Sequence, residues 1–144
     1  FIQERRIITL ATANNLVPYC CNLFYVFDLD SYILYFMSSP DSRHISDALR
    51  NPVVAGTITS PFVNIALLQG IQFTGVFLKM ERELLESAKK YYYKKYPAAK
   101  IMKGEFWGVR IDEVKMTDNK LGFGKKIIWK RDVIEIAELN KEKV

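Results

Sequence analysis

Apolar stretches with little charge alternate with short polar segments along the first part of the chain. Three of the stretches are rich in β-branched and aromatic residues and lack a helical period, which is typical of strands. Turn-forming residues separate them, so we expect an antiparallel meander. Apolar residues occupy both faces, which indicates a barrel interior on one side and helices or a second subunit on the other. The three stretches are residues 6–13, 19–27 and 32–37.

Two helices are predicted between the later strands. The first begins near Asp41 or Ser42, either of which can cap it, and ends at Asn51, because Pro52 cannot continue a helix. The second covers residues 81–96, with acidic residues early and lysines late, as the helix dipole favours.

The rest of the chain supplies four more predicted strands. Short connections and hairpin-like spacings favour antiparallel pairing over a doubly wound sheet. We therefore predict a mainly β domain of six or seven antiparallel strands with two main helices inserted. The additional strands are residues 53–59, 64–80 with a break or bulge near Gly70, 106–116 and 126–136.

Composition supports one folded domain over residues 1–144. An apolar fraction of 49% among 144 residues is enough for one core, and no linker or repeat interrupts the chain. No apolar run reaches the roughly 18 residues that span a bilayer, and no secretion signal begins the chain, so we expect a cytoplasmic protein without membrane contact.

The residues that usually carry catalysis or bind metals are scarce. The single histidine argues against a multi-histidine metal site, and no metal site is expected. Cys20 and Cys21 are neighbours, cannot close a loop with each other and are expected to be buried packing residues. Asp28 and Asp30 are expected to form a turn. No catalytic acid, base or nucleophile is therefore assigned.

One polar segment before the first helix suits a phosphate group. It combines the hydroxyls of Ser38, Ser39 and Ser42 with Arg43, His44 and the free amides of a helix start. A polar loop that only caps a helix would contain the same serines, so both interpretations are open at this point. The guanidinium and imidazole directly behind the serines favour the phosphate.

Other polar and aromatic residues could complete a cofactor site. Asn22 and Gln72 interrupt apolar strands, and a flavin edge, backbone groups or water could satisfy their amides if they are buried. Trp129, together with Phe123, could cover a ligand or a subunit interface, although a simple hairpin explains both equally well. The lysine and tyrosine run at 89–95 is expected to be a solvated helix face.

The order of these motifs resembles the FMN-binding split barrels related to pyridoxamine 5'-phosphate oxidase. The resemblance rests on Leu34-Tyr35-Phe36, Ser42-Arg43-His44, the segment 51–56 and the segment 70–75. Within that superfamily the whole chain, including the segment from Thr117 through Lys126 and Trp129, is most similar to the bacterial YhbP-like family. The resemblance implies an FMN-binding split barrel.

The resemblance also implies a homodimer with an FMN site at each side of the subunit interface. Ser42 and Arg43 match the family's phosphate-binding pair, whereas His44 stands where lysine is frequent. The arginine and lysine of the oxidase's second strand are replaced by residues 22–26, so oxidation of pyridoxamine phosphate is not implied.

The sequence therefore predicts an FMN-binding protein, a flavin-dependent oxidoreductase acting on an unidentified small molecule. The first alternative is a flavin- or haem-binding module without turnover, with His44 as the only possible histidine ligand. The second alternative is a nucleic-acid-binding barrel that uses the lysines at 89–95 and at 125–126.

Overall fold

Alternating burial divides most strands into a core-facing and an outward-facing set of side chains. The computed structural model describes residues 1–61 and 64–131, and these residues contain seven strands and two α-helices. The strands are β1 (Ile7–Asn14), β2 (Val17–Asp28), β3 (Ile33–Ser38), β4 (Val53–Thr59), β5 (Gln69–Leu78), β6 (Glu105–Asp118) and β7 (Lys126–Lys130), and the helices are α1 (Arg43–Arg50) and α2 (Arg82–Lys95).

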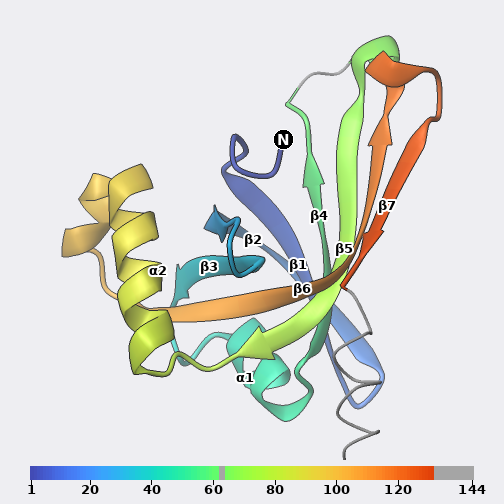
Figure 1. Cartoon of the computed structure of the whole chain (residues 1–144). Coiled ribbons are helices and arrows are strands. Elements are labelled where there is room, and N and C mark those ends of the chain that lie inside the picture. The colour runs from blue at the N-terminus through green and yellow to red at the C-terminus, as the bar shows by residue number, and fades with distance from the viewer. Residues whose placement is uncertain (62–63, 132–144) are drawn as a thin grey trace, which may run out of the picture.

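All strand pairs are antiparallel, and the first six strands close into a barrel. The sheet order is β3-β2-β1-β4-β5-β6-β7, and an additional pairing of β3 with β6 joins the two ends of the six-stranded part. The length of β6 makes this possible, because its first half pairs with β3 and its second half with β7. Figure 1 shows β4 to β7 rising together beyond the closed part of the barrel. The predicted six- to seven-stranded antiparallel split barrel is confirmed.

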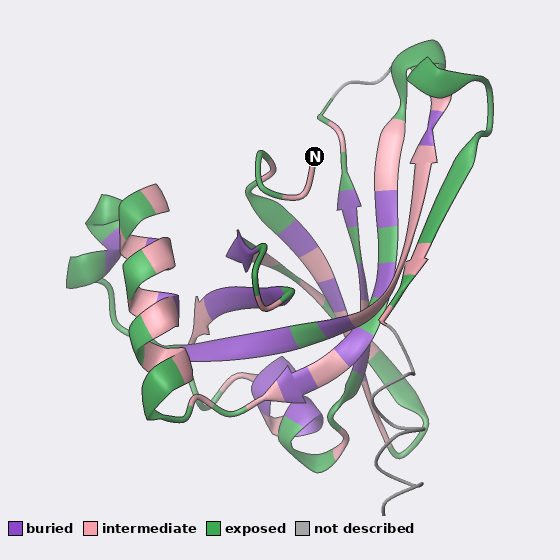
Figure 2. Ribbon diagram, viewed as in Figure 1, coloured by how far each residue is buried: buried purple, intermediate pink, exposed green. Residues whose placement is uncertain are grey.

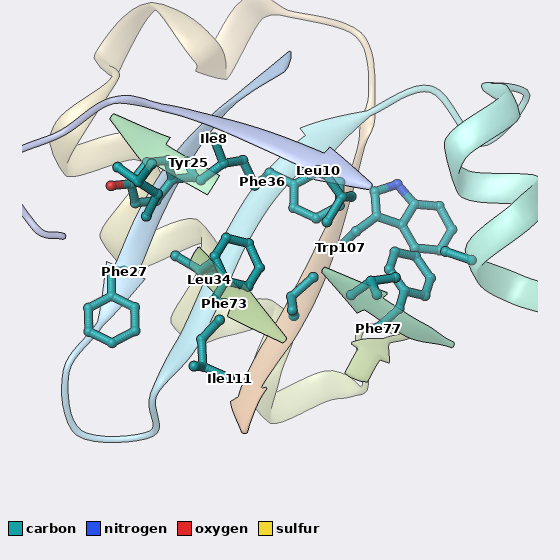
Figure 3. Close-up of a cluster of buried hydrophobic side chains, with 14 of the residues drawn as sticks. Ile8, Leu10, Tyr25, Phe27, Leu34, Phe36, Phe73, Phe77, Trp107 and Ile111 are labelled. Atoms are coloured by element: carbon teal, nitrogen blue, oxygen red, sulfur yellow. The ribbon is translucent and has the colours of Figure 1, made fainter. Parts of the chain in front are cut away.

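Large apolar side chains from every strand of the closed barrel fill its interior (Figure 3). Leu10, Tyr25 and Phe36 are completely buried. The rings of Phe77 and Trp107 stack with their centroids 5.4 Å apart. This packing fixes which face of each strand points outward, because a one-residue slip would expose the whole apolar set.

The two helices cover different parts of the barrel (Figure 1). Ile45 and Ala48 of α1 join the barrel core, and the Nδ2 amide of Asn51 donates to the carbonyl of Ala13, 2.8 Å away. Helix α2 packs on β2, β3 and β6 through a second apolar cluster that includes Ala88 and Tyr92. Figure 2 shows both contact faces among the buried and partly buried residues. No helix in the described part of the chain is long and apolar enough to span a membrane.

The prediction of a strand over residues 64–80 is wrong in two respects: the residue at which the strand starts and the position of the break or bulge. Asn64 accepts a hydrogen bond from the amide of Ala66 and begins a short 3-10 turn, so β5 starts only at Gln69. The register shift falls between Thr74 and Gly75 rather than at Gly70. A side chain at Gly75 would meet the backbone carbonyl of Arg110, which explains the glycine.

The last predicted strand is confirmed for its first part. β7 covers Lys126–Lys130, Arg131 is described and lies beyond the strand, and residues 132–136 of the predicted strand lie outside the described residues. Asp28 forms the predicted turn, since its carboxylate accepts from the amide of Asp30 and the hydroxyl of Ser31.

Candidate functional site

Three side chains of the predicted phosphate segment converge where β3 ends and α1 begins. The hydroxyl oxygen of Ser38 lies 2.8 Å from Nε2 of His44 and 3.2 Å from the hydroxyl oxygen of Ser42. The indole N–H of Trp107 donates to the carbonyl of Ser38 over 3.2 Å and fixes the end of β3. Barrel packing therefore positions this cluster, rather than the loop alone.

The start of α1 lacks a side-chain cap. Ser42 occupies the N-cap position, but its hydroxyl makes no capping hydrogen bond. The hydroxyl of Ser39 instead accepts from the amide of Asp41, 3.3 Å away, within the preceding turn. Because the first amides of a helix need an external acceptor, this end of α1 suits an anion.

Arg43 is held by contacts that sequence reasoning did not predict. Its guanidinium carbon lies 4.4 Å from the ring centre of Tyr19, and its Nε is 3.5 Å from Oδ2 of Asp47. Asp47 is buried, and its Oδ2 forms no hydrogen bond in the described structure, so the pair is an ion pair without good hydrogen-bond geometry. The Arg43 side chain is 54% exposed and can still reach a second anion. The i,i+4 spacing could have revealed Asp47, whereas Tyr19 depends on tertiary structure.

His44 contributes hydrogen bonding rather than charge. Only 8% of the residue is exposed. Burial lowers the pKa of its imidazole below the ordinary 6.5, while the nearby carboxylate of Asp47 opposes the shift. The imidazole is therefore neutral near pH 7, and Arg43 with the helix start supplies the positive potential.

A pocket of about 420 Å³ lies on the outward face of the sheet, formed by β1, β2, β4, β5 and β6. We call it the sheet pocket. Small side chains such as Ala11 and Ala55 form its floor, and the amide of Gln72 is exposed at its wall. Cys20 also lines it and is exposed, so the prediction that Cys20 is buried is wrong. Cys20 lies on the outward face of β2, and Cys21 lies on the inward face.

The sheet pocket and the α1 cluster involve neighbouring residues of β2 that point to opposite faces of the sheet. Arg43 lies over Tyr19, and the next residue, Cys20, lines the sheet pocket. In the pairing of β1 with β2, Ala11 is opposite Cys20. Successive side chains of a strand point to opposite faces, so Tyr19 lies on the inward face with Arg43, and β2 separates the cationic helix start from the sheet pocket.

The remaining predicted residues lie elsewhere. Asn22 is exposed and accepts a hydrogen bond from the hydroxyl of Thr9, so the condition of a buried, unsatisfied amide is not met for it or for exposed Gln72. Trp129 stacks on Tyr32 with a centroid distance of 4.8 Å and lines an apolar pocket of about 300 Å³ on the other side of the sheet. The structure does not bring Trp129 to the α1 cluster.

The helix run at 89–95 is not uniformly solvated. The ammonium group of Lys95 donates to the carbonyls of Gln3 and Arg5, so this lysine faces the N-terminal segment instead of solvent. The prediction of a solvated face is wrong for Lys95, because the polypeptide that it binds is far away in sequence.

Relatives of the chain cover nearly its full length. A UPF0306 protein of Photorhabdus laumondii is 39% identical over 131 residues, which are 91% of this chain and 92% of that protein. The UPF0306 protein YhbP of Escherichia coli O9:H4 is 34% identical over 132 residues, 92% of this chain and 90% of that protein. The chain belongs to the UPF0306 family. The predicted similarity to YhbP-like proteins is therefore confirmed. A scan against protein-family models found no match to the chain.

Solved structures establish the split-barrel fold for this UPF0306 protein. A NimC/NimA family protein from Clostridium acetobutylicum has a TM-score of 0.67 and 21% identity, covering 91% of this chain and 87% of that one. A heme binding protein from Mycobacterium smegmatis has a TM-score of 0.71 and 19% identity, covering 88% and 53%. A FAD-binding protein from Mesorhizobium loti has a TM-score of 0.65 and 18% identity, covering 80% and 87%.

Proposed function

We propose that this UPF0306 protein binds FMN and uses it as a flavin-dependent oxidoreductase on a small molecule. The single observation that supports this most is the start of α1, where Ser42 makes no capping hydrogen bond and the half-exposed Arg43 follows it directly. A cofactor with a phosphate group suits such a helix start. A structural neighbour described as FAD-binding agrees with a flavin on this fold.

The residues would divide the binding task. Arg43, the hydroxyl of Ser42 and the uncapped amides of α1 would hold the phosphate, and Ser38 with His44 would fix the hydroxyl orientations. The small floor of the sheet pocket would admit the ring, and Gln72 would offer its amide to the ring edge. Bound flavin would supply the redox chemistry, so the reaction would need no protein nucleophile.

The sheet pocket is shallow enough to need a second wall, and we propose a second copy of the chain for that role. Alternate residues of β1 and β4 present threonine and alanine side chains on this outward face, which would let two sheets approach closely. Light scattering of the purified protein tests this. A mass of one chain, with FMN bound, would contradict the dimer but leave FMN binding intact.

The decisive experiment compares FMN with riboflavin, which lacks the phosphate. Replacing Arg43 alone would leave the buried Asp47 carboxylate without its partner, so the useful variant is Arg43→Gln with Asp47→Asn. Asp47→Asn alone is the matched control, because it keeps the guanidinium. Flavin titrations followed by fluorescence quenching give all affinities.

We expect the control to prefer FMN over riboflavin by about tenfold or more, the effect of a charge-assisted hydrogen bond. The double variant should lose that preference while binding riboflavin as the control does. Equal binding of the two flavins by the unmodified protein would rule out the phosphate site. A colourless protein with no thermal shift at near-millimolar FMN would rule out the cofactor.

The two alternatives fit the geometry less well. A haem iron would need Nε2 of His44 or its other ring nitrogen, but the imidazole is buried and Nε2 contacts Ser38. A Soret band in the purified protein would nevertheless establish haem. The hypothesis of nucleic-acid binding through residues 89–95 loses support, because the ammonium group of Lys95 already donates to two backbone carbonyls. Salt-sensitive retention on heparin would support it.

A further inference from the structure

A second pocket lies on the same outward face of the sheet, near the start of β1, with a volume of about 600 Å³. Its polar lining comes from Arg5, Arg6, Thr9, Asn22, Thr57 and Thr59, and we call it the arginine pocket. Thr9 and Thr57 also line the sheet pocket, so the two pockets form one continuous groove. Arg6 lies five residues before Ala11, a separation of about 17 Å along an extended strand.

The arginine pocket is strongly cationic. Two guanidinium groups line it, and its one acidic residue, Glu4, has a side chain that is 74% exposed and 3.9 Å from the Arg5 guanidinium. The Nε of Arg5 is buried and forms no hydrogen bond in the described structure. Because that atom is buried, an anion in the pocket would bind the terminal N–H groups of the two arginines instead.

A third cation adds to the positive potential behind the pocket. The ammonium group of Lys95 lies 2.6 Å from the carbonyl oxygen of Arg5. Burial, with repulsion from Arg6 as the smaller cause, lowers the pKa of Lys95 to about 8. Lys95 therefore adds a third positive charge near the two arginines at this end of the groove.

Neutral donors complete the lining. The Oδ1 atom of Asn22 already accepts from the hydroxyl of Thr9, so the amide NH2 is what this side chain can offer a ligand. Thr57 and Thr59 bring further hydroxyl groups from β4. Arginine, amide and hydroxyl donors together are suited to the oxygens of a carboxylate or phosphate.

We propose that the arginine pocket binds the carboxylate or phosphate of the small molecule that this protein acts on. The assignment as a substrate site rests on the proposed function, because the sheet pocket, which shares Thr9 and Thr57 with the arginine pocket, would hold the flavin ring beside this anion. Anion binding itself does not depend on flavin. The substrate class is then a small organic anion rather than a neutral or cationic compound.

The test is a titration of flavin-free, isotope-labelled protein with inorganic phosphate, and separately with acetate, followed by amide NMR at constant ionic strength. We expect saturable shifts at Thr9, Asn22 and Thr57. The variant Arg5→Gln with Arg6→Gln should weaken binding there by about tenfold or more, as expected for loss of charge-assisted bonds. Phosphate shifts at the α1 cluster should persist in that variant.

A control with the same net charge is Arg82→Gln with Lys120→Gln, both exposed and outside the arginine pocket. It should bind as the unmodified protein does. Absence of saturable shifts at the three residues, or equal binding by both double variants, would overturn the proposal. If the arginine variant does not fold, Asn22→Ala should show the same selective weakening.

The flavin-loaded protein separates the two proposals. If FMN binds, acetate or phosphate should change its absorption spectrum in the unmodified protein but not in the Arg5→Gln, Arg6→Gln variant. If FMN does not bind while the anion shifts remain, the proposed cofactor fails and the anion site stands. A spectrum insensitive to both anions in FMN-loaded protein would contradict the substrate assignment.

Discussion

The hydroxyl of Ser38 at the end of β3 meets Nε2 of His44 in the first turn of α1, with 2.8 Å between the two atoms. This contact ties the barrel wall to the helix that covers it. Since His44 is also buried, the imidazole is part of the packing of α1 as well as of the candidate phosphate site. The protonation of His44 therefore affects both stability and anion binding.

We predict that His44 titrates below its ordinary pKa of 6.5, because burial penalises the imidazolium. The unfolded chain then holds more protons than the folded protein just below pH 6.5, so stability falls as pH falls through that window. His44 is the only histidine, so its ring C–H resonance can be followed without ambiguity in an NMR titration. Asp47→Asn should lower the pKa further, since the carboxylate opposes the shift.

A pKa of 6.5 or above for folded His44 would contradict the prediction. The same protein in concentrated urea provides the reference, where the pKa should return to about 6.5.

Alkaline pH should first stabilise the protein and then destabilise it. The pKa of Lys95 is lowered to about 8, chiefly by burial, so between pH 8 and about 10.4 the unfolded chain keeps a proton that the folded protein releases, and stability rises. Burial raises the pKa of Tyr96 to about 12 and also raises that of Tyr25. Above about pH 10 the folded protein retains those protons, so stability falls.

Urea unfolding at intervals from pH 7 to 11 measures this profile. Lys95→Met should remove the rise, whereas Lys94→Met, at the exposed neighbouring position, should leave it unchanged. A rise of the same size in both variants would show that Lys95 is not its source.

The register shift in β5 should make Gly75 far less tolerant of substitution than Gly70. A Cβ at Gly75 would collide with the Arg110 carbonyl and lie 3.0 Å from Cγ1 of Val109, so Gly75→Ala should cost about 1–3 kcal/mol in the free energy of unfolding. At Gly70 the nearest atom would be the Ile58 carbonyl oxygen, 3.7 Å away, an ordinary contact. Gly70→Ala is therefore the control.

Chemical denaturation of both variants gives the comparison. Gly70→Ala should stay close to the unmodified protein or be slightly more stable, since alanine restricts the unfolded chain. Similar losses at both glycines would refute the role assigned to the register shift.

Local sequence determined the elements whose signals lie within a few neighbouring residues. Helix α2 follows from its charge order and from Pro97 beyond its end, and the Asp28 turn from its own side-chain hydrogen bonds. The apolar stretch at 53–59 likewise predicted the bounds of β4, because strand preference is a local property. These signals, with the motif order, were enough for the fold.

Tertiary structure decided how those elements combine into a site. Pairing of β3 with β6 closes the barrel, and it joins segments whose mutual register no local pattern encodes. The same closure turns Cys20 and Gln72 outward into one groove and leaves Trp129 on another face. The placement of Arg43 over Tyr19, and of Arg5 and Asn22 in the lining of one pocket, follows from packing between distant segments. Local residue preferences specify which strands form, but burial of the whole core decides which side chains share a pocket.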